Sequence, residues 1–175
     1  MAYVNIASTT VGSGGASTVT FSSIPQIYRD LEVIINGRSN VSGYVDTMTC
    51  QFNGSGSMTL NIAYALHNNN NSNSISTGTV SSTNNVGWSI GNTGHNSNIF
   101  GFTKLYFTNY SNTNIPTHLW SKTQDCTNLA QSSNNIYIGN VTGYTSANTA
   151  ITQLTLGFAS SSWMQYTDIS LYGIG

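Results

Sequence analysis

Charge is what this sequence has least of. Its 175 residues include four Lys or Arg and five Asp or Glu, so 5% are charged and the net charge is -1. Proteins that bind nucleic acids neutralise several phosphates with cations, and four cations supply too few for such a partner or for an anionic membrane surface. Apolar runs extend only a few residues, far short of the roughly 20 that span a bilayer. We therefore expect neither a nucleic-acid nor a membrane partner.

Residue patterns for metals and thiol chemistry are also missing. Cys50 and Cys126 lie far apart without a CxxC or Cys/His spacing. Two readings remain: buried free thiols, which the strand pattern around Cys50 favours, or one disulfide. His67, His95 and His118 lie in separate segments without HxH or HExxH spacing, so we predict no metal and no cofactor.

Catalytic patterns are scarce as well. The one G-x-S-x-G match, GWSIG at residues 87–91, has no helical pattern after it, and the same tight Gly-containing loop lacks the Lys of a phosphate-binding loop. Asp30 and Glu32 share a strand face and form the one carboxylate pair that a glycosidase would use. An exposed or ion-paired start of a strand explains the same two residues without any further group. We predict that the protein is not an enzyme.

What the sequence does contain is uncharged polar and aromatic residues. Aromatic residues make up 11% of the chain, including ten tyrosines, whereas disordered chains are usually charged and poor in aromatics. Apolar and polar residues alternate along most of the chain, and no window has a convincing helical period. Abundant β-branched and aromatic residues with few helix formers indicate an all-β protein.

The alternation predicts about ten strands joined by short turns. Shared strand faces are predicted for Leu31, Val33 and Ile35, for Met48, Cys50 and Phe52, for Leu154, Leu156 and Phe158, and for Ile169 and Leu171. This pattern predicts one domain over residues 1–175, an antiparallel two-sheet β-sandwich of jelly-roll type, with a long polar loop near 67–85. That tract as a linker between two small domains is the alternative, but each half would be marginal in size for its own core.

Two segments at the ends of the chain resemble a known class of proteins. FSSIPQIYRDLEVIINGRS carries Pro25, Tyr28, Asp30 and Leu31, and YTDISLYGIG carries Leu171, Tyr172 and Gly173. Together they are similar to a pattern of small β-sandwich virion proteins of tailed bacteriophages. Proteins of this kind serve as capsid decoration or cement subunits, and also in tail fibres and adhesins. Because this chain has no collagen-like repeat or coiled-coil heptad with which a fibre would attach, the resemblance favours a decoration subunit.

The resemblance implies a structural role on the outside of a capsid. The expected partners are the major capsid protein and further copies of the chain, in a homo-oligomer that is a trimer rather than a dimer. MAYVNIASTT lacks the basic region of a secretory signal, so we expect synthesis in the bacterial cytoplasm before incorporation into the virion. A glycan-binding tail-fibre or receptor-binding module remains the alternative, because the tryptophans, tyrosines and asparagines also suit sugar binding.

The residues expected to contact a partner are polar and aromatic, because interfaces are enriched in aromatic side chains. The N-terminal segment is expected to add a strand to a neighbouring subunit. The four charged residues between Arg29 and Arg38 are expected on the outer face and at the ends of their strand. The predicted contact residues are Ala2, Tyr3, Val4, Asn68, Asn69, Asn70, Asn71, Trp88, His95, Tyr110 and Trp163.

Overall fold

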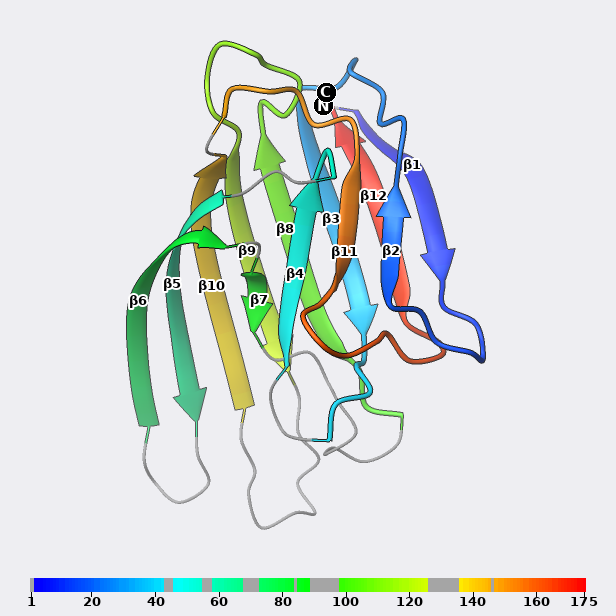
Figure 1. Cartoon of the computed structure of the whole chain (residues 1–175), viewed down its shortest axis with the longest axis vertical. Coiled ribbons are helices and arrows are strands. Elements are labelled where there is room, and N and C mark those ends of the chain that lie inside the picture. Colours follow the sequence, from blue (N-terminus) through cyan, green and yellow to red (C-terminus); the bar gives the residue numbers. More distant parts are fainter. Residues whose placement is uncertain are drawn as a thin grey trace.

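The computed structural model describes residues 2–42, 46–54, 58–67, 73–83, 85–88, 98–125, 136–145 and 147–175 (Figure 1). For 58–67, 73–83, 85–88, 125 and 136–137 it describes the backbone alone. The strands are β1 (Tyr3–Thr10), β2 (Thr18–Phe21), β3 (Asp30–Gly37), β4 (Thr47–Phe52), β5 (Met58–His67), β6 (Asn73–Thr83), β7 (Asn85–Trp88), β8 (Gly101–Thr108), β9 (His118–Asp125), β10 (Ile136–Thr145), β11 (Leu154–Phe158) and β12 (Asp168–Ile174). The all-β prediction is confirmed for the part of the chain described.

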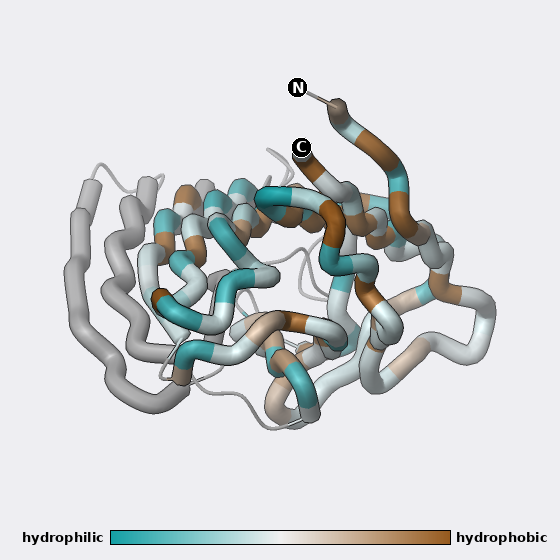
Figure 2. Tube along the Cα trace, turned by 90° about the horizontal axis from the view of Figure 1, so that it is seen from above, coloured by the Kyte–Doolittle hydropathy of each residue, from teal (hydrophilic) through white to brown (hydrophobic). Residues whose placement is uncertain are grey.

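The strands form two antiparallel sheets that face each other as a sandwich (Figures 1 and 2). The larger sheet has eight strands in the order β1-β12-β3-β8-β9-β10-β5-β6, and the smaller has four in the order β2-β11-β4-β7. Most connections cross from one sheet to the other, whereas β5 and β6 and the run from β8 to β10 join neighbours within the larger sheet. The β-sandwich prediction is therefore confirmed.

The core lies between the sheets and follows the predicted alternation. Leu31, Val33 and Ile35 of β3 are fully buried, and each contributes about 1.5–3 kcal/mol by leaving water. Cys50 of β4 is a buried free thiol, and burial raises its pKa to about 12, so it is packing material rather than a nucleophile. Other predicted core residues that the structure buries are Met48, Phe52, Leu154, Leu156, Phe158, Ile169 and Leu171.

The prediction of a long polar loop near 67–85 is wrong for most of its length. Residues Asn73–Thr83 form β6, which pairs with β5 from Leu60↔Val80 to His67↔Asn73. Ile75, Thr77, Thr79 and Val80 are β-branched and favour extended backbone, and an edge strand tolerates polar residues on both faces. The many Asn and Ser residues of this tract led to the prediction of a loop, although its Ile, Val and Thr residues favour a strand.

The two segments that carry the resemblance lie side by side in the structure. Strand β12 pairs with β3 so that Gly173 lies opposite Leu31, and Tyr172 lies opposite Glu32. The ring of Tyr28 packs on Gly173, where an added Cβ would lie 2.3 Å from the ring. A glycine is therefore required at this position by the close approach of the Tyr28 ring. Both chain ends meet at this end of the sheet (Figures 1 and 2).

Candidate functional site: the outer face of the eight-stranded sheet

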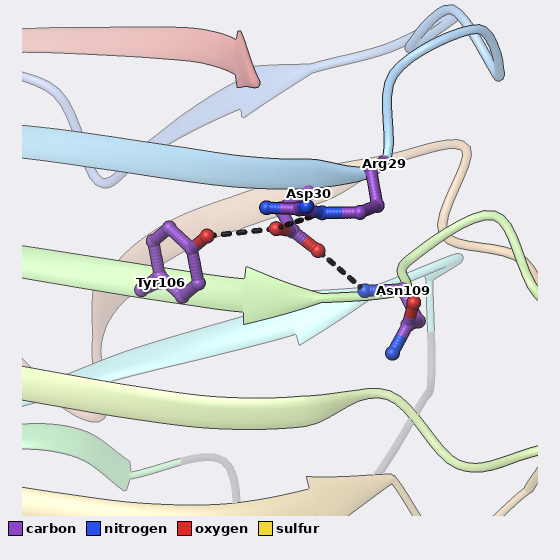
Figure 3. A network of polar contacts seen from close by, with 4 residues as sticks. All are labelled: Arg29, Asp30, Tyr106 and Asn109. Carbon is purple, nitrogen blue, oxygen red and sulfur yellow. Dashed lines mark hydrogen bonds and ion pairs between the residues drawn. The ribbon is translucent and has the colours of Figure 1, made fainter. Parts of the chain in front are cut away.

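The first polar cluster on the outer face of the larger sheet is built around Asp30 (Figure 3). Its Oδ2 accepts hydrogen bonds from Arg29 Nε at 2.8 Å and from the Tyr106 hydroxyl at 2.7 Å. Its Oδ1 accepts from the backbone N–H of Asn109 at 2.9 Å. Three donors from β8 and the turns beside it thus hold one carboxylate at the start of β3.

This environment makes Asp30 a stronger acid than usual. Burial by itself would raise its pKa, but the hydrogen bonds from Asn109, Tyr106 and Arg29 stabilise the ionised form and hold the pKa below its ordinary value. A glycosidase general acid needs the opposite, a raised pKa. The network therefore does not suit Asp30 to the role of a general acid.

Glu32 is the centre of a second cluster on the same face. Tyr3 donates its hydroxyl to Oε1 at 2.6 Å, and Lys104 Nζ lies 2.6 Å from Oε2. The ring of Tyr3 stacks on that of Tyr172 at 4.6 Å, so the two rings lie beside the carboxylate. Burial and the negative charge of Glu32 both raise the pKa of Tyr3. This cluster ties edge strand β1 to β3 and β8.

The expected position of these charges was therefore half right. Asp30 and Glu32 do point to the outer face, but they are 3% and 5% exposed and lie under neighbouring side chains. Arg38, expected at the exposed end of the strand, is buried too. A buried charge is tolerated only where it is paired and hydrogen-bonded. Tyr106 and Arg29 meet that requirement for Asp30. Tyr3 and Lys104 meet it for Glu32.

Two predicted contact residues are wrong, because Tyr110 and Trp163 lie in the core. Tyr110 is fully buried and donates its hydroxyl to the carbonyl oxygen of Pro25. Trp163 is fully buried, donates its Nε1 proton to Leu156 O at 3.1 Å and packs on Phe158. Both rings lie outside the twelve strands, where alternation says nothing about burial, and their polar atoms are satisfied inside the sandwich.

The other predicted contact residues have varied positions. Ala2, Tyr3 and Val4 are exposed at the edge of the larger sheet. Trp88 ends β7, where its backbone pairs with Thr47, and its side chain is not described. Residues Asn68–Asn71 and His95 lie outside the described part of the chain.

None of the exposed aromatic residues of β8, β9 and β10 is among the predicted contact residues, although the tryptophans and tyrosines were considered for sugar binding. Phe102, Trp120 and Tyr144 are 43%, 40% and 42% exposed, while Leu105 and Leu119 on the opposite faces of their strands are buried. Alternation around Leu105 predicted that Phe102 points outward, which is the signal that could have found it. We call the outward residues of these strands the aromatic face: Phe102, Lys104, Tyr106, His118, Trp120, Lys122, Gln124, Ile138, Asn140, Thr142 and Tyr144.

The strand register arranges the aromatic face in rows. Three rows across β8, β9 and β10 are Phe102↔Gln124↔Ile138, Lys104↔Lys122↔Asn140 and Tyr106↔Trp120↔Thr142. A fourth row ends with His118 beside Tyr144, whose ring centres lie 6.2 Å apart. Adjacent strands are about 4.8 Å apart and same-face neighbours on one strand about 6.6 Å apart, so the rows form a regular grid.

A second candidate is a small hollow beside the start of β12. Its volume is about 220 Å³, and its wall includes the buried Arg38. Asn98 and Tyr166 both have positive φ, 73° and 70°, which is uncommon for Asn and a clear outlier for Tyr. The residues around the hollow are Arg38, Asn98, Phe100, Met164, Gln165 and Tyr166.

The described residues form neither a metal-binding cluster nor a membrane-spanning helix. These residues contain no group of three or more His, Cys, Asp or Glu side chains placed to hold a metal ion. The same part of the chain forms no helix long and apolar enough to cross a bilayer. Comparison with known proteins finds no family model that matches this chain and no matching curated protein. Function must therefore be argued from the fold and the outer face.

Proposed function

We propose that the sandwich is a jelly roll with two added hairpins. The support is the strand order: without β5, β6, β9 and β10, the sheets read β1-β12-β3-β8 and β2-β11-β4-β7. In this arrangement the first and last strands are neighbours, and successive strands alternate between the sheets except for β4 and β7, which pair within the smaller sheet. The eight-stranded jelly roll of two Greek keys has this arrangement. The added strands then extend one sheet without changing the path of the other eight.

On this basis we propose a structural role in the virion of a tailed bacteriophage. The chain acts as a capsid decoration protein, a homo-oligomer, with a trimer favoured over a dimer, that binds the outer shell. The strand order carries this proposal, since jelly rolls recur in viral capsid and lectin domains, and the resemblance of its end segments points the same way. The role is mechanical: the protein bridges neighbouring capsid subunits and adds buried area at their junctions.

Edge strand β1 is the attachment site that the geometry favours. It carries no charged residue, and no described strand pairs with its outer edge. Ala2 and Gly175 exchange both backbone hydrogen bonds at 3.1 Å, so alternation turns the N–H and C=O of Tyr3 toward the open edge. Unpaired edge groups of this kind accept a strand from another chain. A register shift between Asn5 and Ala7 limits the straight part of the edge to its first residues.

The number of copies in purified virions tests the proposal. A decoration protein occurs in a fixed ratio to the major capsid protein and appears over the whole shell in a cryo-EM map. Each contact needs about 800 Å² per partner for specific binding, and repetition over the shell strengthens modest contacts. A few copies confined to the tail would overturn the proposal and favour the receptor-binding alternative.

A pair of variants tests the edge itself. Val4→Lys places a charge on β1 and is expected to lower the number of copies retained on washed virions, because charged side chains block edge pairing. Ile27→Lys makes the same change in an exposed loop, where Ile27 is 81% exposed, and is expected to leave retention unchanged. Equal retention of the two variants would remove β1 from the contact.

A further inference from the structure

The aromatic face exposes large rings without a packing reason. Leu105, Phe107, Leu119 and Val141 already supply the apolar residues that β8, β9 and β10 bury in the core. The rings on the opposite face of these strands cover nothing in the core, and within the described chain no element lies over them. Clustered exposed aromatic residues of this kind usually mark a binding surface.

The positive charges of this face are arranged unfavourably for the protein alone. Lys104 and Lys122 are direct cross-strand partners, and like charges directly opposite each other destabilise a sheet. Lys104 is compensated by Glu32, whereas none of the described carboxylates forms an ion pair with the exposed Lys122. A chain with four Lys and Arg residues in total thus places two of them together in the middle of an aromatic surface.

Amide and hydroxyl groups complete the grid around the two lysines. Asn140 lies opposite Lys122, Gln124 lies between Phe102 and Ile138, and Thr142 lies opposite Trp120. The centre of a protein–protein contact is usually depleted of Lys, and a nucleic acid needs many more cations than this chain has. Flat rings, hydrogen-bonding side chains and one uncompensated ammonium group instead match a ligand with apolar ring faces, hydroxyls and carboxylates.

We propose that the aromatic face binds an acidic oligosaccharide, a glycan that carries carboxylate groups. The C–H faces of its sugars pack on Trp120 and on the rings of Phe102 and Tyr106. Asn140 and Gln124 exchange hydrogen bonds with hydroxyl groups, which amide side chains do as both donors and acceptors. The ammonium group of Lys122 pairs with a carboxylate.

The dimensions of the grid indicate a chain of sugars rather than a single one. Phe102 and Tyr106 are four residues apart on β8, which is about 13 Å at 3.3 Å per residue. Lys104 lies between them, and Lys122 lies opposite it on β9, so a ligand that contacts both rings passes over Lys104 and beside Lys122. In the sheet, β12 and β3 separate β8 from the edge strand β1. The site is thus distinct from the proposed attachment edge and does not depend on the place of the chain in a virion.

The test is a binding measurement with matched acidic and neutral sugars. The purified protein is applied to an array of oligogalacturonates, oligoguluronates and sialyllactose, together with methyl-esterified oligogalacturonates and lactose as uncharged counterparts. Isothermal titration and NMR chemical-shift mapping then follow for the acidic sugar with the strongest signal. We expect binding to the acidic forms, shifts confined to β8, β9 and β10, and weaker affinity at high salt because charge pairs are screened.

Three variants locate the site. Trp120→Ala is expected to weaken binding about tenfold or more, the loss of one stacking surface. Lys122→Gln is expected to weaken binding of the acidic sugar about fivefold and to leave the affinity for the methyl-esterified sugar unchanged, since the substitution removes a charge and little else. Ile27→Ala removes an apolar side chain that lies outside the face and is 81% exposed, and it is expected to leave the affinity for both sugars unchanged.

Each other outcome counts against the proposal. Binding to none of the acidic sugars overturns it, and equal binding of acidic and esterified forms overturns the role of Lys122. If Trp120→Ala leaves the affinity for the acidic sugar unchanged and the NMR shifts lie outside β8, β9 and β10, the aromatic face is not the binding site. If the variants abolish attachment to capsids and no acidic sugar binds, the face is a protein interface. Chemical denaturation of each variant, with Lys122→Gln as the mildest change, separates loss of binding from loss of folding.

Discussion

The outer face of the eight-stranded sheet has two regions that differ in how far their side chains are exposed to solvent. Over β12, β3 and β8, the carboxylates of Asp30 and Glu32 are almost completely covered, although they point away from the core. Over β8, β9 and β10, Phe102 and Trp120 remain exposed, and Lys122 has no described ion-pair partner. The first region is closed by its own side chains, whereas the second is open.

This difference indicates that the burial of a side chain on the outer face depends on the side chains of the neighbouring strands. Glu32 lies between Tyr172 on β12 and Tyr106 on β8, and it accepts the hydroxyl proton of Tyr3 from β1. Trp120 lies between Tyr106 and Thr142, which do not cover it. A tyrosine beside a carboxylate builds a closed network, but an aromatic row beside hydroxyl and amide groups stays available for a ligand.

The largest expected effect comes from opening the closed region. Asp30→Ala removes hydrogen bonds from Arg29, Tyr106 and the backbone of Asn109, and leaves the Asn109 N–H without its acceptor. We expect a loss of about 3 kcal/mol in the free energy of unfolding, since bonds to charged groups and unsatisfied donors are each worth about 1–3 kcal/mol. Urea denaturation measures it.

A matched change in the open region provides the control. Asn140→Ala alters an exposed side chain in the middle of β10 and is expected to change the free energy of unfolding by less than about 0.5 kcal/mol. Comparable losses in the two variants would mean that the two regions do not differ in the way described.

A smaller effect is expected from acid, and it belongs to the closed region. The pKa of Asp30 is lower in the folded protein than its ordinary value of 3.8, so the unfolded chain takes up this proton first as the pH falls. The stabilisation is complete above the unfolded pKa and is lost as the pH falls through the folded pKa. Urea midpoints between about pH 5 and pH 2 are expected to fall less steeply for Asp30→Asn than for the natural sequence. Parallel curves would contradict the assignment.

The smallest effect is expected in the open region and has the opposite sign. Lys122→Gln removes a like charge directly opposite Lys104 and is expected to stabilise the protein by about 0.3 kcal/mol at low salt. The gain should disappear at high salt, because the repulsion between exposed charges is screened. Thermal unfolding at two salt concentrations checks this. A destabilised variant would show that Lys122 has a partner within the protein.

The fold was largely predictable where alternation is clear. The core positions of β3, β4, β11 and β12 follow from a period of two, and so does the buried thiol of Cys50. Strand β6 was missed because polar composition outweighed its β-branched residues.

The candidate site was predictable only in part. Trp120 was considered as a sugar-binding ring together with Trp88 and Trp163, and its parity with Leu119 supports exposure. The sequence could not distinguish Trp163 from Trp120, because Trp163 lies in an irregular segment. The backbone of Trp163 forms isolated bridges to Ala16 and to Ser39 and does not belong to a strand. Residue type alone does not separate a core tryptophan from a surface one.

By itself, the sequence determined the class of the protein: low charge, period-two alternation and frequent turn residues specify an all-β sandwich and most residues of its core. Tertiary structure alone decided that β3 pairs with β12, so that Glu32 lies beside Tyr172 and is covered, and that β8 pairs with β9, so that Lys104 faces Lys122. The physical reason is the separation along the chain of the residues that come into contact. Alternation along a strand divides its residues between two faces, but the neighbours across each face come from strands distant in the chain.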